Sequence, residues 1–171
     1  CGPAQPTQTP EPTRIPSTPV PTAIRQPSVT PLPTVESFSD GVQVTFVGNS
    51  GFLITGGDKK ILIDALFDGF EGDYALPQDV QEALANARAP FDGIDLILAT
   101  HAHGDHFDSG LVRRHLQHNP KAMFASTRQA TAPLMDLQGR VLSFEASRGK
   151  VDRKDVSGIQ VEALYLSHGA P

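Results

Sequence analysis

Apolar and polar residues alternate at the start of what reads as the globular part of the chain. Between residues 42 and 47 the alternation has a period of two, which is typical of a strand with one buried face. Apolar runs at 51–55 and 60–63 flank Gly56-Gly57-Asp58, a sequence that favours a tight turn between two strands. The pattern therefore predicts three consecutive strands, the last two of which form a hairpin.

Strand and helix patterns alternate after these three strands. We predict strands at 94–99, 122–125, 141–144 and 159–166, and helices at 78–88, 110–118 and 127–137. Asp108-Ser109 is a helix-starting sequence, and Asn119-Pro120 ends the same helix. Residues 146–157 are rich in charge, and we expect a hairpin turn or an irregular edge there. This order of elements indicates an α/β layered domain with a mixed sheet.

Residues 1–40 differ in composition from the rest. They consist largely of Pro, Thr, Ser and Gln and contain most of the chain's 15 prolines. Proline lacks a backbone donor, and the segment has too little apolar surface to offset the entropy of ordering. We therefore predict a disordered tether over residues 1–40, followed by a domain over residues 41–171.

Cys1, the single cysteine of the chain, stands directly before this tether. The arrangement resembles a mature bacterial lipoprotein, whose signal peptide is removed just before a lipid-bearing cysteine. The resemblance implies lipid attachment at Cys1 and a position at the cell surface or in the periplasm, anchored to a bacterial membrane. A sequence boundary that falls at Cys1 by chance is the alternative.

The overall composition narrows the classes of partner. With 39% hydrophobic and 19% charged residues, the sequence fits a globular protein. Its net charge of −5 gives no reason to expect nucleic acid as a partner, because phosphate binding needs a basic surface. No apolar stretch approaches the roughly 20 residues of a membrane-spanning helix. The sequence does not define an oligomeric state.

The strand predicted at 94–99 runs directly into His101-Ala102-His103-Gly104-Asp105-His106. In extended geometry, residues two apart point the same way, so His101 and His103 can bind one ion together. Gly104 allows a sharp turn that would aim Asp105 and His106 at a neighbouring position. Imidazole nitrogens and a carboxylate are ligands of zinc and similar divalent ions. The cluster predicts a metal site, with a solvated polar turn as the alternative.

This motif resembles the signature of the metallo-β-lactamase superfamily, and the resemblance extends over residues 41–171. Residues 48–64 look like the opening hairpin of that family, which ends in the aspartate Asp64. Residues 165–169 look like the strand end that supplies a further histidine, His168. The resemblance implies a metallo-β-lactamase-like αββα sandwich, of which this chain carries the first half.

The resemblance also implies roles for the candidate site residues. The implied ligands are His101, His103 and His168 for a first metal ion, and Asp105 and His106 for a second. Asp64 would orient one of these histidines rather than bind metal itself, although polar termination of a strand also explains its presence. For His168, an ordinary surface histidine after a strand is the alternative.

Two further histidines, His115 and His118, fall on the helix predicted at 110–118. We expect them at the surface or at the helix end rather than in the metal site. A protonated His118 would interact favourably with the dipole at the C-terminus of this helix.

The second half of the superfamily fold supplies an aspartate that bridges both metals and a last histidine. No residue of this sequence matches those two ligands, and the sequence ends at Pro171. We expect the sequence to be truncated at its C-terminus, so that the sheet face that packs on the other half is exposed. A self-sufficient half, completed by dimerisation, is the alternative.

The resemblance implies a metal-dependent hydrolase. A metal ion lowers the pKa of bound water to about 7, and the resulting hydroxide would attack a carbonyl or phosphoryl centre with Asp105 helping to orient it. We expect one or two zinc ions, with iron or manganese as alternatives, and a small-molecule substrate with an ester, lactone, thioester or phosphodiester bond. The rival hypotheses are a non-catalytic, metal-binding surface lipoprotein and a redox protein with iron in the site.

Overall fold

The structure, a computed structural model, describes Gly2 and residues 41–69 and 75–167. Apart from Gly2, the predicted tether lies outside the described residues, as do the predicted lipid-attachment residue Cys1 and the predicted ligand His168. The fold below is therefore that of residues 41–69 and 75–167. None of its helices combines the length and apolar character needed to span a membrane.

A mixed six-stranded sheet forms the centre of the described residues, with the strands in the order β1-β2-β3-β4-β5-β6. These strands are β1 (Val42–Gly48), β2 (Gly51–Gly56), β3 (Lys59–Ile63), β4 (Leu96–Leu98), β5 (Met123–Thr127) and β6 (Val141–Phe144). The first three pair antiparallel, and β3 to β6 pair parallel. The predicted α/β class with a mixed sheet is confirmed.

Helices lie on one face of this sheet. They are α1 (Gln78–Ala85), α2 (Ser109–His118), α3 (Arg128–Thr131) and the 3₁₀ turn η1 (Ala132–Leu134). As predicted, Asp108 begins α2, where its carboxylate accepts a 2.7 Å hydrogen bond from the main-chain N–H of Leu111. The single helix predicted at 127–137 is wrong, because the segment divides into α3 and η1. Pro133 has no N–H with which to continue an α-helix.

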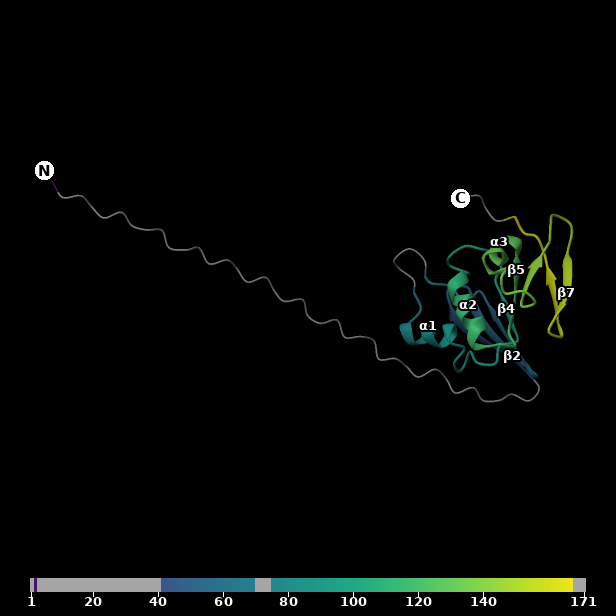
Figure 1. Cartoon of the computed structure of the whole chain (residues 1–171), viewed down its shortest axis with the longest axis horizontal. Coiled ribbons are helices and arrows are strands. Elements are labelled where there is room, and N and C mark those ends of the chain that lie inside the picture. Colours follow the sequence, from purple (N-terminus) through teal and green to yellow (C-terminus); the bar gives the residue numbers. More distant parts are fainter. Residues whose placement is uncertain (1, 3–40, 70–74, 168–171) are drawn as a thin grey trace. The chain divides into compact units, whose positions relative to one another are not determined.

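The main core lies between the helices and this sheet face. Phe124 of β5 and Leu62 of β3 are fully buried, as are Leu84 of α1 and Leu116 of α2, within one continuous apolar cluster. Figure 1 shows α1 and α2 on the same side of the sheet. The two-residue side-chain period of each strand places the alternate residues on the opposite face.

A separate antiparallel hairpin covers part of that opposite face. Its strands are β7 (Asp152–Val156) and β8 (Ile159–Ala163), and its buried Val156 packs with Leu96 and Ala125 of the central sheet. The irregular edge expected at 146–157 is therefore wrong over β7. Charged side chains on the outer face hide the strand pattern, and one of them, Arg153, bonds across the hairpin to Glu162 at 2.7 Å.

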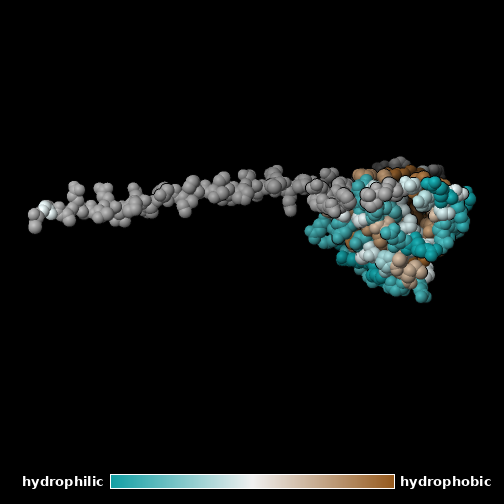
Figure 2. Space-filling model, turned by 90° about the horizontal axis from the view of Figure 1, so that it is seen from above, coloured by the Kyte–Doolittle hydropathy of each residue, from teal (hydrophilic) through white to brown (hydrophobic). Residues whose placement is uncertain are grey.

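The rest of the opposite face, over β1 and β2, is apolar and exposed in the described structure. Val42, Val44 and Phe46 alternate along β1 and are 71%, 59% and 59% exposed. Phe46 pairs with Phe52 of β2, with the ring centroids 5.6 Å apart in an edge-to-face arrangement. Figure 2 shows hydrophobic residues reaching the surface of the domain among hydrophilic ones.

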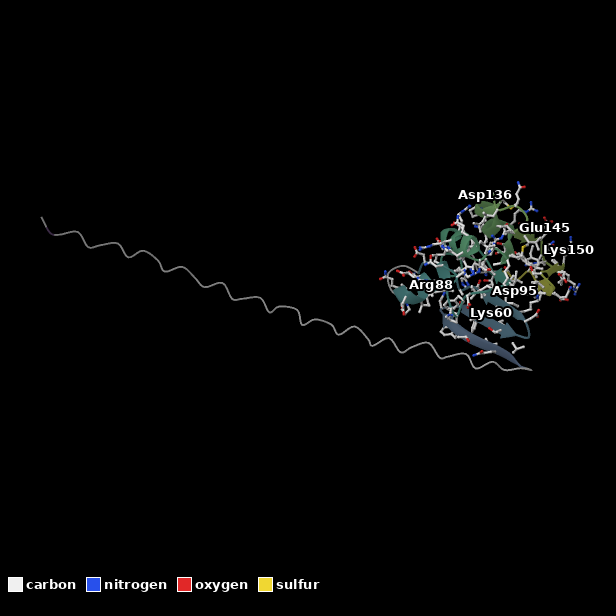
Figure 3. All side chains as sticks on the ribbon, turned by 60° about the horizontal axis from the view of Figure 1, so that its bottom comes forward. Lys60, Arg88, Asp95, Asp136, Glu145 and Lys150 are labelled. Atoms are coloured by element: carbon white, nitrogen blue, oxygen red, sulfur yellow. The ribbon has the colours of Figure 1, made fainter. Side chains whose placement is uncertain are left out.

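A carboxylate holds the start of β4. Asp95, directly before β4, accepts hydrogen bonds from the main-chain N–H of Lys60 at 2.9 Å and from Nζ of Lys121 at 3.2 Å. Figure 3 shows Lys60 and Asp95 close together. Burial alone would raise the pKa of Asp95, but these donors outweigh it and lower the pKa. The charged carboxylate thus fixes the start of β4 against β3.

Candidate metal site

The candidate site lies at the carboxyl ends of two neighbouring parallel strands. β3 and β4 pair with Ile63 opposite Leu98, and the main-chain N–H of Asp64 extends this pairing with a 3.0 Å bond to the Leu98 carbonyl. Asp64 therefore follows β3 at the same edge where residues 99–106 follow β4. The sheet brings together two segments that are about 40 residues apart in the sequence.

The histidine-rich segment forms a tight loop that returns to the core. The main-chain N–H groups of His106 and Phe107 both donate to the His103 carbonyl at 3.0 Å. Beyond the loop, the N–H of Asp108 donates to the Leu66 carbonyl at 2.7 Å, and the ring of Phe107 stacks on Phe124 with the centroids 5.5 Å apart. The C-terminal end of the loop is thus fastened to buried structure.

Three potential ligand atoms converge in this loop. One ligand atom each of His101, His103 and Asp105 lies within 4.8 Å of the other two. Nε2 of His101 and Nδ1 of His103 are 3.0 Å apart, so the two imidazoles turn toward one point. Two imidazole nitrogens and a carboxylate oxygen suit zinc and similar divalent ions. The residues present therefore fit a metal ion.

His106 borders this group without being one of the three. Its Nε2 is 3.4 Å from Oδ2 of Asp105, and its ring centroid is 4.2 Å from that of His101. The resemblance assigned Asp105 to a second ion together with His106. In the structure the Asp105 carboxylate lies close to His106 as well as within the group that contains His101 and His103.

The buried carboxylate of Asp64 positions the histidine-rich loop through hydrogen bonds. Its carboxylate is 3% exposed and accepts three hydrogen bonds: from the main-chain N–H of Thr100 at 2.7 Å, from Oγ1 of Thr100 at 2.8 Å, and from Nδ1 of His106 at 3.0 Å. An ionised carboxylate only accepts, so Nδ1 of His106 donates this bond, and in the neutral ring Nε2 is the nitrogen with the lone pair. That lone pair faces Asp105, on the side of the predicted metal site.

Thr100 connects the Asp64 carboxylate with the imidazole of His101 through its hydroxyl group. The hydroxyl has one proton, which it donates to Asp64, so it accepts at 3.0 Å from Nδ1 of His101. In the neutral ring Nε2 of His101 is then the unprotonated nitrogen, and it is the atom that faces His103. Thr100 was not among the predicted site residues, although it lies between a predicted buried strand and the first histidine in the sequence.

The expectation that His115 lies at the surface is wrong. His115 is fully buried between α1 and α2, and its Nδ1 donates to the Leu84 carbonyl at 2.6 Å. Burial lowers the pKa of its imidazole, so the neutral form is favoured. His118 is exposed at the last residue of α2, with Nδ1 2.9 Å from the Arg114 carbonyl. Neither histidine belongs to the convergent group.

The strand predicted at 159–166 is shorter than expected. β8 ends at Ala163, and Leu164, Tyr165 and Leu166 follow as exposed residues outside any strand. The predicted third ligand, His168, lies just beyond, outside the described residues. Its role stays a prediction.

Comparison with known proteins agrees with the motif. Residues 44–120 match the family model described as the metallo-beta-lactamase superfamily. This match begins within β1 and includes β2 to β4, α1, α2 and the whole histidine-rich loop. The resemblance to this superfamily is therefore confirmed for residues 44–120.

Curated relatives have more specific descriptions than the superfamily model. The chain is similar to a "UPF0173 metal-dependent hydrolase" of Pyrococcus furiosus, with 40% identity over 84 residues, 48% of this chain and 32% of the relative. A protein of Pyrococcus horikoshii with the same description is 43% identical over 74 residues, 43% of this chain and 28% of the relative. The matched segments thus span about a third of these relatives.

Two solved structures are similar to part of this chain. A "putative metal-dependent hydrolase" from Parabacteroides distasonis is 19% identical with a TM-score of 0.44, covering 65% of this chain and 40% of that protein. Igni18, described as "a novel metallo hydrolase" from Ignicoccus hospitalis, is 21% identical with a TM-score of 0.43, covering 68% of this chain and 45% of that protein.

Proposed function

We propose that this chain is part of a metal-dependent hydrolase that acts on a small molecule with an ester, lactone, thioester or phosphodiester bond. The observation that carries the proposal is the convergence of His101, His103 and Asp105 within 4.8 Å. The domain family and the relatives named as metal-dependent hydrolases support the same class of activity.

The ligand set that we propose for the first ion is His101 and His103, with His168 as a third histidine. When bound, a divalent ion supplies Lewis acidity, which lowers the pKa of water and polarises the electrophilic oxygen of a substrate. Zinc suits the mixture of imidazole and carboxylate, with iron or manganese as the alternatives and a second ion at Asp105 and His106.

The chain's own residues would orient the reactants. The Asp105 carboxylate has two oxygens, and one of them can accept a hydrogen bond from the attacking water while the other stays with the ligand group. The Asp64–Thr100 pair fixes which nitrogen of His101 and His106 carries a proton, so both rings present a lone pair without rearrangement. Such preorganisation favours catalysis as well as binding.

Zinc binding and hydrolysis by the protein of full natural length test this function. Wild-type protein should bind zinc and cleave at least one of a set of chromogenic esters, lactones, thioesters and phosphodiesters. His103→Ala should abolish both activities, whereas His118→Ala, which removes an exposed histidine outside the site, should change neither. Zinc-loaded wild-type protein that cleaves none of these substrates would contradict the proposal.

We also propose that Cys1 carries lipid and anchors the protein to the outer side of a bacterial membrane. The Pro- and Thr-rich segment that directly follows Cys1 supports this location. Intact-mass measurement on the membrane fraction of the native host should show a diacylglycerol adduct on Cys1. Unmodified protein recovered only in the soluble fraction would contradict it.

A further inference from the structure

The turn between β1 and β2 lies directly against the candidate metal site. A Cβ atom at Gly51 would be 3.0 Å from Cα of Ala65 and 3.0 Å from the carbonyl oxygen of Asp64. Both distances are shorter than ordinary van der Waals contact, so glycine favours this close approach. The turn is therefore packed on the segment that supplies Asp64.

The same turn reaches the histidine-rich loop through a side chain. Nδ2 of Asn49 donates a 2.7 Å hydrogen bond to the main-chain carbonyl of Asp105, across 56 residues of sequence. Within the part of the chain that the structure describes, this is the one hydrogen bond received by that carbonyl. The His103 carbonyl before Asp105 and the Asp108 N–H after it also make main-chain hydrogen bonds. The bond from Asn49 fixes the peptide of Asp105, which lies between them.

Asparagine suits this position for two separate reasons. The backbone of Asn49 has a φ of 48°, in the left-handed region that asparagine tolerates better than most other residues. Its side-chain amide also provides the N–H donor that reaches Asp105. Glycine would satisfy the backbone but would lack the donor, which makes the two properties separable by substitution.

We propose that Asn49 is a positioning residue that holds the carboxylate of Asp105 at the metal site by fixing its main-chain carbonyl. The inference rests on the proposed metal-dependent function. Asp105 moves with its peptide, so loss of the bond leaves the loop with more conformations to lose when metal binds. For an exposed, neutral hydrogen bond, we expect metal affinity to fall by about three- to tenfold.

The experiment compares two asparagines that make the same kind of bond. Nδ2 of Asn86 donates to the Glu82 carbonyl, also at 2.7 Å and also exposed, at the end of α1. Zinc affinity is measured by competition with a chromophoric chelator for the full-length wild-type, Asn49→Gly and Asn86→Gly proteins. Thermal unfolding of each protein in its metal-free form measures stability separately.

A double-mutant cycle separates positioning from a general loss of structure. Zinc affinity is also measured for Asp105→Ala and for Asp105→Ala combined with Asn49→Gly. If Asn49 acts through Asp105, Asn49→Gly should weaken zinc binding in the wild-type background and have no effect in the Asp105→Ala background. The Co²⁺ absorption spectrum should also change in Asn49→Gly but not in Asn86→Gly.

The outcomes distinguish this inference from the function on which it rests. Weaker zinc binding in Asn49→Gly alone, with coupling to Asp105, supports the positioning role. Unchanged affinity, or an equal loss in Asn86→Gly or in the Asp105→Ala background, overturns it while leaving the metal site intact. If the wild-type protein binds no zinc, the proposed function itself fails and the positioning role fails with it.

Discussion

The buried carboxylate of Asp64 accepts a 3.0 Å hydrogen bond from Nδ1 of His106 across 42 residues of sequence. The same carboxylate binds both the N–H and the hydroxyl of Thr100, so one side chain fixes the start of the histidine-rich loop and one of its histidines. Asp64 itself has a φ of 47°, a conformation that few residues other than Asn, Asp and Gly adopt readily. The position of Asp64 therefore requires a residue that tolerates a positive φ and that carries a hydrogen-bond acceptor with negative charge.

We predict that Asp64→Asn weakens zinc affinity by about 10- to 100-fold, because an amide cannot accept from all three donors and lacks the negative charge. Competition with a chelator measures the loss. Asp58→Asn is the matched control, since the Asp58 side chain is 89% exposed and lies in the turn after β2. Equal zinc affinity in Asp64→Asn and wild type would show that Asp64 does not support the site.

Thr100 offers a test of proton placement on His101. Thr100→Val keeps the shape of the side chain but removes the hydroxyl that connects Asp64 with Nδ1 of His101. We expect zinc affinity to fall by about three- to tenfold, because the proposed ligand His101 loses the modest hydrogen bond that orients its ring. Thr100→Ser should restore it, because serine keeps the hydroxyl. Failure of serine to restore affinity would assign the effect to packing.

Acid should destabilise the metal-free protein partly through His115. Burial lowers the pKa of this imidazole in the folded state below its unfolded value of 6.5. The unfolded state therefore binds the proton first, so the stabilising effect is full above about pH 6.5 and is lost as pH falls below it. Denaturant unfolding between pH 8 and pH 5 should show a smaller pH dependence in His115→Gln than in wild type. His118→Gln, at an exposed histidine of the same helix, should retain the wild-type dependence.

Arg140 stabilises the end of α2 and the approach to β5. Its guanidinium donates to the carbonyls of Leu116, Asn119 and Ala122 at distances of 2.7 to 3.1 Å. Removing it leaves these acceptors without their charged partner, so Arg140→Met should lower the free energy of unfolding by about 1.5–3 kcal/mol. Arg148→Met, at an exposed arginine, should cost less than about 0.5 kcal/mol. Denaturant titration compares the two variants.

Local sequence patterns predicted the fold well where apolar periodicity was strong. The three consecutive strands, the capped helix α2 and the parallel strands β4 to β6 follow from alternation, turn residues and the Asp108 cap. β7 was not predicted because four of its five residues are charged, which hides the alternation of a strand. Its strand conformation depends on pairing with β8. Burial of His115 was also invisible, because it depends on where α1 packs against α2.

In the candidate site, too, local sequence predicts some features, whereas others depend on contacts between distant segments. His101 and His103 are two residues apart, so a local motif was enough to predict that they face one point, whereas it placed Asp105 with His106 at a neighbouring position. The pairing of Asp64 with His106 depends on the parallel register of β3 and β4. The bond from Asn49 depends further on how the β1–β2 turn packs on Asp64. Only a resemblance to known proteins pointed to Asp64, and nothing in the sequence pointed to Asn49.

Because β3 and β4 must pair to form the candidate site, metal binding should depend on folding. Neither the loop after β4 nor the carboxylate after β3 can be in place until these two strands have paired. An unfolded chain should therefore have much lower affinity for the ion, and by mass action every tenfold excess of free metal over its dissociation constant adds about 1.4 kcal/mol of stability. Cells that starve the protein of metal would then lose it through unfolding and proteolysis as well as through inactivity.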